Sequence, residues 1–93
     1  MRVISNKALV QFALRQPVAS GSLQAWRKAI EANAFAGFSQ LKHTFNTVDR
    51  VGGFYVFDIG GNKYRLVASV HFDKQRLYVR HVFTHTEYDT WRP

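Results

Sequence analysis

The sequence contains no cysteine, only two prolines and only six acidic residues. Without cysteine the chain can form no disulfide, no thiolate nucleophile and no zinc finger or iron–sulfur cluster held by cysteines. No apolar run approaches the roughly 18 residues of a membrane span, and no signal-peptide segment follows Met1. A chain of 93 residues has the length of one domain. We therefore expect a single domain over residues 1–93 that is soluble, cytoplasmic and without a membrane partner.

Positive charge and aromatic rings are what the chain has in excess. Thirteen lysines and arginines give a net charge of +7, and eight of these residues are arginine. The planar guanidinium of arginine suits both phosphate oxygens and aromatic faces. An imbalance of this size in a small domain indicates a phosphate-rich or strongly acidic partner. The alternative is a basic surface that merely covers an aromatic core.

The first half of the chain has the periodicity of helices. A first helix is expected from Asn6, and it ends before Pro17, which cannot continue it. Ser22 is the expected N-cap of a second helix, after a loop over residues 18–21. Gly37 interrupts this second helix, and a short helical turn follows. The residues that form the apolar stripes are Leu9, Phe12, Ala13, Leu23, Trp26 and Ile30.

From Thr47 the periodicity changes to that of strands. Runs over residues 54–59, 63–72 and 76–83 are joined by short turns, which predicts an antiparallel meander. Residues 2–5 are expected to add an edge strand. The predicted fold class is α+β, with two N-terminal helices packed on one face of the sheet. The other face, or part of it, is expected to be free for function.

Polar residues near the end of the chain have informative spacings. Thr84 and Glu87 have the spacing of a capping box, which predicts a short C-terminal helix after Thr84. Strict alternation along the last strand places His81 with the core residues, as a hydrogen-bonded core histidine. His81, His85 and Asp89 are spaced four apart, but they cross the boundary between strand and helix, so helical ligand geometry fails. We expect neither a metal site nor a cofactor.

Arginines on the free face are the main candidates for a phosphate site. Arg65 lies in the middle of a strand with apolar neighbours, where it either pairs with Asp58 across the sheet or awaits an anionic ligand. Arg80 on the adjoining strand adds a second positive charge and favours phosphate binding. The other residues expected to bind substrate on this face are Lys63, Ser69, Arg76 and Tyr78.

His85 directly follows the last strand, where a rigid scaffold positions functional groups. Histidine exchanges protons near neutral pH, as cleavage of a phosphodiester requires. Tyr88 lies three residues further on and shares a helical face with His85. It is expected to stack on a base or donate a hydrogen bond. A surface histidine and a core tyrosine are the alternatives without function.

Residues 54–62, 63–70 and 80–89 resemble the HigB family of toxins, most specifically in the ending Thr84-His85-Thr86-Glu87-Tyr88-Asp89. This family belongs to the RelE-like group of mRNA interferases in bacterial type II toxin–antitoxin systems. The resemblance implies a RelE-like fold and a ribosome-dependent endoribonuclease that cuts translated mRNA. It also implies a cognate HigA-like antitoxin with a helix-turn-helix domain.

The resemblance also implies roles for individual residues. Arg65 occupies the strand position of the phosphate-binding arginine of the family, and Arg80, His85 and Tyr88 lie where the other catalytic groups are found. RelE-type relatives place lysines on the preceding strand, at positions that are here Val56 and Asp58. Lys63 in the hairpin is the residue left to supply that positive charge.

Two other functions remain open at this level. ParE-like proteins of the same fold group inhibit DNA gyrase and cleave nothing. A plain RNA-binding module would use the same basic, aromatic face and yield no fragments; its binding would fall steeply with salt.

Overall fold

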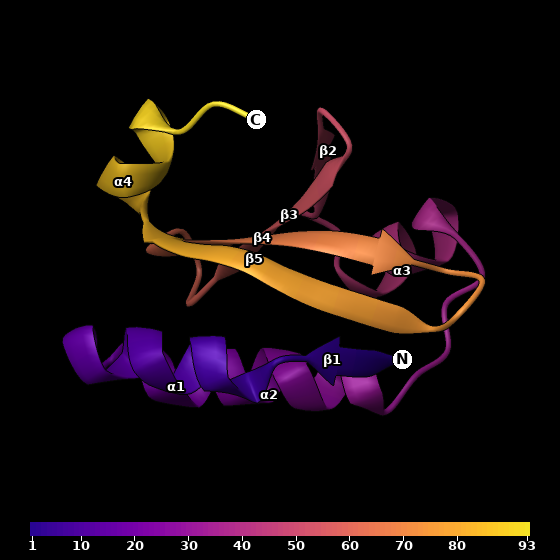
Figure 1. The fold of residues 1–93 in the computed structure, drawn as a ribbon, viewed down its shortest axis with the longest axis horizontal. Helices are drawn as coiled ribbons and strands as arrows, with labels where there is room; N and C mark the ends of the chain where they lie inside the picture. Colours follow the sequence, from indigo (N-terminus) through magenta and orange to yellow (C-terminus); the bar gives the residue numbers. More distant parts are fainter.

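A computed structural model describes all residues, 1–93, as one mixed sheet with helices on both faces (Figure 1). The five strands lie in the order β1-β5-β4-β3-β2. None of the helices is both long and apolar enough to cross a lipid bilayer. Along the chain the elements are β1 (Arg2–Ile4), α1 (Asn6–Arg15), α2 (Ala19–Glu31), α3 (Phe38–Thr44), β2 (Asp49–Val51), β3 (Phe54–Ile59), β4 (Tyr64–His71), β5 (Arg76–Thr84) and α4 (His85–Thr90).

Helices α1 and α2 cover one face of the sheet, here called the inner face (Figure 1). The apolar stripes predicted for both helices are buried against it. The expected start of α2 at Ser22 is wrong, because the helix begins three residues earlier, at Ala19. The amides of Ala19 and Ser20 donate to the carbonyls of Gln16 and Pro17, so the chain turns helically straight after the proline. Ala19 is fully buried, which gives this early start a packing partner.

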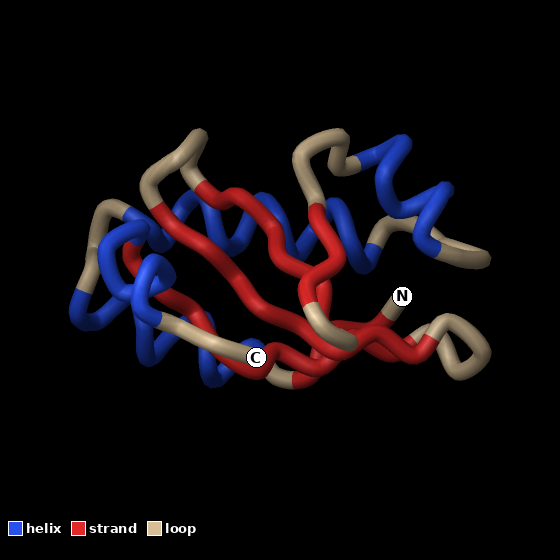
Figure 2. Tube along the Cα trace, turned by 90° about the horizontal axis from the view of Figure 1, so that it is seen from above, coloured by secondary structure: helices blue, strands red, loops and turns tan.

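Strands β3, β4 and β5 form the predicted antiparallel meander. Strand β1 is the predicted edge strand, but it runs parallel to β5, so the sheet is mixed. Strand β2, paired with β3, was not predicted because its three residues are too few to show an alternation. The fold class is confirmed as α+β, with α3 as an additional short helix at one corner (Figure 2).

A β-bulge interrupts β5 at Arg80. Val67 pairs with His81 and Ala68 pairs with Val79, so Arg80 has no partner on β4. A single extra residue reverses the alternation of all later side chains. His81 therefore lies on the face opposite α1 and α2, here called the outer face, and is exposed. The prediction of a core histidine at this position is wrong for that reason.

The outer face is partly covered, so only part of it is free, as the prediction allowed. Val56 and Val67 pair on this face and are buried. The ring of Trp91 lies 5.7 Å from that of Phe54 and 6.2 Å from that of Phe83. Figures 1 and 2 show α4 and the C-terminal residues over this side of the sheet. A small second apolar cluster therefore joins the C-terminal segment to the sheet.

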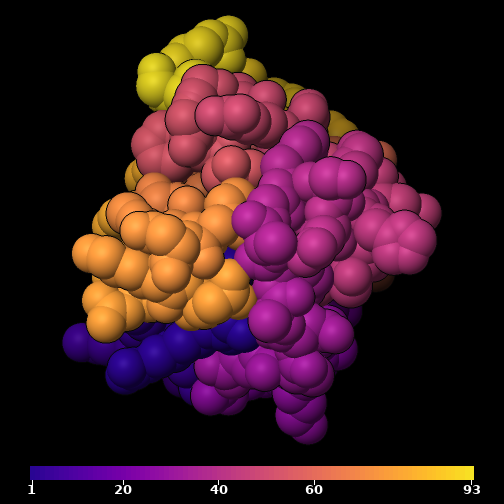
Figure 3. Space-filling model, turned by 90° about the vertical axis from the view of Figure 1, so that its right-hand side faces the viewer, coloured from indigo at the N-terminus to yellow at the C-terminus, as the bar shows by residue number.

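The end of the molecule away from α4 is closed by the turn between β4 and β5, seen in orange in Figure 3. The Gln75 side chain donates to the Phe35 carbonyl at 2.6 Å and accepts from the Phe35 amide at 3.2 Å. The Arg2 amide donates to the Gln75 carbonyl. These bonds hold the loop after α2, the N-terminus and the hairpin together.

Candidate active site

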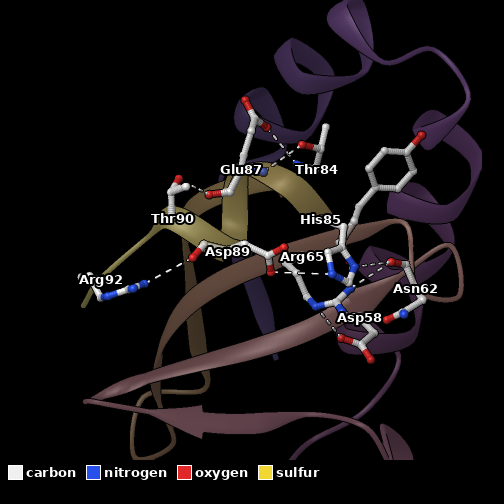
Figure 4. A network of polar contacts seen from close by, with 10 residues as sticks. Asp58, Asn62, Arg65, Thr84, His85, Glu87, Asp89, Thr90 and Arg92 are labelled. Carbon is white, nitrogen blue, oxygen red and sulfur yellow. Dashed lines mark hydrogen bonds and ion pairs between the residues drawn. The ribbon is translucent and has the colours of Figure 1, made fainter.

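Arg65 is at the centre of a polar cluster at the end of the sheet beneath α4 (Figure 4). Its Nε lies 3.1 Å from Asp58 Oδ1 on β3, in register across the two strands. Its Nη2 donates to Asn62 Oδ1 at 2.7 Å, and its Nη1 faces the carbonyls of Asn62 and Tyr64 at 3.2 Å. The side chain of Arg65 is only 12% exposed. The hairpin thus holds the guanidinium in one orientation.

The contacts of Arg65 leave part of the guanidinium available to a ligand. A guanidinium has five N–H donors, of which two are on Nη2. Nη2 has one acceptor, Asn62 Oδ1, so its second N–H is free of the protein. The predicted structural pair with Asp58 is present, yet it engages only Nε. Pairing with Asp58 and binding of an anion are therefore compatible in this geometry.

His85, the first residue of α4, lies beside Arg65 above the same hairpin. Its backbone amide donates to the Lys63 carbonyl at 3.0 Å. Its Nδ1 is 3.3 Å from the Asn62 carbonyl oxygen, and its Nε2 is 3.6 Å from Asp89 Oδ1. The two ring nitrogens thus face two oxygen atoms, one of the Asn62 carbonyl and one of the Asp89 carboxylate, which fix the orientation of the ring. About half of the side chain remains exposed, so a substrate can reach the ring.

Tyr88 completes the cluster from the next turn of α4. The guanidinium carbon of Arg65 lies 5.8 Å from the centre of its ring. On its other flank Tyr88 stacks on Trp91 at 5.9 Å, with 26° between the ring planes. Tyr88 is half-buried. The contact of Arg65 with the Tyr88 ring, and the contacts of Asn62 with Arg65 and His85, bring these side chains together in the structure.

The predicted capping box fixes the start of α4. Thr84 Oγ1 accepts from the Glu87 amide at 3.2 Å, and the Glu87 carboxylate accepts from the Thr84 amide at 2.8 Å. A six-residue helix is too short to be stable alone in water, so this cap and the contacts of Trp91 hold it. The same cap therefore sets the positions of His85 and Tyr88.

Replacing Thr84 with alanine is expected to lower the free energy of unfolding by about 1 kcal/mol, because the Glu87 amide loses its acceptor. Urea denaturation measures the difference. Thr86→Ala is the matched control, since Thr86 is exposed and has no side-chain hydrogen bond. Equal destabilisation by the two substitutions would contradict a capping role for Thr84.

Arg80 does not join this cluster, contrary to the expectation of two neighbouring arginines. Its Nε donates to Ser69 Oγ at 3.0 Å, and its guanidinium carbon is 5.1 Å from the centre of the Tyr78 ring. Ser69 is four residues beyond Arg65 on β4, a distance of roughly 13 Å. The two arginines therefore do not face one common phosphate.

The remaining predicted substrate-binding residues are divided between these two places. Ser69 and Tyr78 accompany Arg80. Arg76 pairs with His71 at the far end of the meander. Lys63 is exposed in the hairpin next to the Arg65 cluster, to which it contributes its backbone carbonyl.

Sequence reasoning missed two members of the site. Asn62 was interpreted only as a turn residue, yet its side chain and carbonyl contact both Arg65 and His85. The signal was its place in a tight turn three residues before the candidate arginine. Trp91 was given no role, although it lies three residues after Tyr88, one helical turn away.

The metal-binding capacity of the chain follows from its donor groups. The side chains form no group of three or more histidine, aspartate or glutamate residues that could hold a metal ion. The cluster itself offers a guanidinium, an imidazole and a phenol, held by the Asp58 and Asp89 carboxylates and by Asn62.

Comparison with known proteins gives a consistent match. The model of the HigB_toxin family, described as the RelE-like toxic component of a toxin–antitoxin system, matches residues 19–91. The mRNA interferase toxin HigB of Escherichia coli K12 is 38% identical over 92 residues, covering 96% of this chain and 88% of that protein. The mRNA interferase HigB of Shigella flexneri matches equally, and that of Escherichia coli O6:H1 is 28% identical over 96% of this chain and 89% of its own. The chain therefore belongs to the HigB family of RelE-like toxins of toxin–antitoxin systems.

Proposed function

We propose that this toxin is an endoribonuclease that cleaves translated mRNA in the cytoplasm, an mRNA interferase like the relatives named above. The observation that carries the proposal is the convergence of three side chains: Asn62 contacts both Arg65 and His85, and Arg65 lies against the ring of Tyr88. An anion-binding guanidinium, a proton-transferring imidazole and an aromatic ring in one cluster suit a phosphodiester of single-stranded RNA.

The reaction needs no group beyond the RNA itself as nucleophile. The ribose 2′-hydroxyl gives its proton to a water molecule as its oxygen attacks the adjacent phosphorus, and the bond from phosphorus to the 5′-oxygen breaks. The products are a 2′,3′-cyclic phosphate and a free 5′-hydroxyl. Negative charge builds on the non-bridging oxygens in between, and the free N–H of Arg65 Nη2 stabilises it. Because the hairpin holds Arg65 in place, little reorganisation accompanies this step.

His85 acts as the general acid that protonates the departing 5′-oxygen. Its neighbours support this role, because the Asn62 carbonyl and Asp89 orient the ring. The phenol and ring of Tyr88 hold the base next to the cleaved bond by stacking or hydrogen bonding.

The partners follow from the family and the charge. A toxin of a toxin–antitoxin system has an antitoxin partner, and we propose a HigA-like protein with a helix-turn-helix domain. We further propose that cleavage takes place on the ribosome. A net charge of +7 favours approach to ribosomal RNA, through a term that weakens as salt rises.

Incubation of the purified toxin with a defined mRNA, with and without translating ribosomes, tests the proposal. We expect fragments ending in a cyclic phosphate only when ribosomes translate. Cleavage of naked mRNA would support the nuclease activity but contradict its dependence on the ribosome. The absence of fragments in both mixtures would contradict the nuclease activity and favour a gyrase inhibitor or an RNA-binding module. A DNA supercoiling assay and an RNA-binding assay would distinguish these two.

Replacing His85 with alanine is expected to slow cleavage by about 10²- to 10⁴-fold, the range typical of a lost general acid. The rate of fragment appearance under single-turnover conditions measures it. Since His85 is half-exposed, the melting temperature should stay close to that of the parent. A folded variant that cleaves at the parent rate would remove His85 from the mechanism.

A further inference from the structure

All of the large apolar side chains that are exposed on this molecule lie in one short stretch of the chain. Val10 is 47% exposed, Leu14 is 77% exposed and Val18 is 74% exposed. Single exposed apolar residues are common on soluble proteins and need no explanation. These three, however, follow one another at intervals of four residues. The spacing therefore indicates one surface rather than scattered residues.

The exposed apolar residues of α1 are on the side of the helix that points away from the sheet. Residues three and four apart share a face of a helix, so Lys7, Val10 and Leu14 lie in one row. Leu9 and Phe12 are on the opposite side of the same helix and are buried against the sheet. Figure 1 shows α1 and α2 as the outermost layer on this side of the molecule, so no element of the chain covers the row.

Helix α2 extends this surface with a glycine and a second lysine. The Gln24 side chain donates to the Asn6 side chain at 2.8 Å, which fixes how far each helix has advanced where the two meet. The connection between the helices is short, so they are antiparallel, and Gly21 lies beside the middle of α1 while Lys28 lies beside its first turn. A Cβ added to Gly21 would meet no atom within 4 Å. We call this surface the helix-pair face, and its residues are Lys7, Val10, Leu14, Val18, Gly21 and Lys28.

The helix-pair face is basic at one end and apolar at the other. Lys7 and Lys28 are exposed at the end where α1 begins, and neither belongs to an ion pair. The one acidic residue of the two helices, Glu31, is paired with Arg27. A molecule that covers this face must therefore bring apolar side chains to one end and negative charge to the other.

Two kinds of partner fit the helix-pair face poorly. RNA would neutralise the lysines, but its phosphates would lie against exposed apolar side chains. A second copy of this chain would use the same patch on both subunits, as two-fold dimers do. Four lysines would then enter one interface that holds no free carboxylate. An acidic protein segment with an apolar side matches both ends, and a toxin of a toxin–antitoxin system has a protein partner, the antitoxin.

We propose that the helix-pair face is the docking site of the antitoxin, which lays an amphipathic helix along it. Apolar side chains of that helix cover Val10, Leu14 and Val18, and its acidic side chains reach Lys7 and Lys28. The inference rests on the antitoxin partner named above but not on the cleavage of mRNA. Because α1 and α2 cover the inner face, the sheet separates the docking site from the candidate active site on the outer face.

The test is binding of the purified antitoxin, taken as the product of the neighbouring gene that relieves growth arrest by the toxin. Isothermal titration calorimetry gives the dissociation constant. Leu14→Ala is expected to weaken binding about 10- to 100-fold, as truncation of a central interface side chain does. The variant should melt like the parent, since Leu14 is exposed and alanine favours a helix. Lys7→Gln combined with Lys28→Gln should make the affinity less dependent on salt.

Gly21→Gln tests the same face by adding a side chain instead of removing one. The free toxin has room for it, and glutamine favours a helix more than glycine does. The added side chain would occupy the space of the docked helix, so we expect weaker antitoxin binding by a toxin that is at least as stable as the parent. Lys74→Gln is the matched control for the lysines, because Lys74 is exposed in the turn between β4 and β5. It should bind the antitoxin with parent affinity.

Each of the other outcomes is informative. Parent affinity for the antitoxin in Leu14→Ala and in the folded double variant Val10→Ala/Leu14→Ala would overturn the proposal. A toxin that sediments alone as a dimer, and as a monomer after Leu14→Ala, would assign the face to a second copy of the chain and would also overturn it. Failure of the proposed function has a different signature, because a parent toxin that cuts no mRNA could still bind the antitoxin through Leu14.

Discussion

Replacing Arg65 with alanine is expected to reduce mRNA cleavage by at least about 10²- to 10³-fold, because the developing charge on the phosphate loses a fixed donor. The prediction follows from the position of Nη2, which has one N–H free beside His85 and Tyr88. The rate of cyclic-phosphate formation from a defined mRNA, with translating ribosomes, measures the effect. Arg65→Lys should restore little activity, since lysine cannot reproduce a planar guanidinium that binds Asp58, Asn62 and a phosphate together.

Two companion variants separate chemistry from folding in this prediction. Arg50→Ala removes an exposed arginine from the edge strand β2 and should cleave at the parent rate. Asp58→Asn keeps the shape of the partner but removes its charge, so Arg65 loses an ion pair and is held less firmly. A folded Arg65→Ala protein with parent activity would show that Arg65 is only the structural partner of Asp58.

Replacing Phe57 with alanine is expected to lower the free energy of unfolding by about 3–5 kcal/mol, the usual range for truncation of a buried phenylalanine. Phe57 on β3 is 1% exposed, and its ring lies 5.2 Å from that of Trp26 and 5.4 Å from that of Phe45. It thus joins the sheet to α2 and to the segment after α3. Small domains have only about 5–15 kcal/mol of stability in total, so this variant should be close to unfolding at room temperature.

Urea denaturation followed by tryptophan fluorescence tests this second prediction. Phe54→Ala is the matched control, because Phe54 is the same residue type on the same strand but is half-buried on the outer face. Its loss removes a contact with Trp91 and should cost clearly less. Equal losses for the two variants would mean that the outer cluster matters as much as the main core.

Much of the fold is determined locally, and the sequence alone was sufficient for it. The bounds of β3 were predicted from its apolar run, and the turn at residues 60–62 from its two glycines, both of which have positive φ. The capping box of α4 was predicted from Thr84 and Glu87 alone. The candidate residues Arg65, His85 and Tyr88 were also found, because strand position and helical spacing place them without knowledge of distant contacts.

Other features depend on contacts between distant segments, and only the tertiary structure decided them. The bulge at Arg80 is set by the pairing of β5 with β4, and periodicity within β5 does not reveal it. For that reason His81 was predicted on the wrong face of the sheet, and Arg80 was placed with Arg65. The contacts of Trp91 with Phe54 and Phe83 likewise depend on the path of the chain after α4. Side-chain alternation is a local property of one strand, whereas register is a property of a pair of strands. The separation of Arg80, which lies with Ser69 and Tyr78, from the Arg65 cluster on the outer face follows from that register.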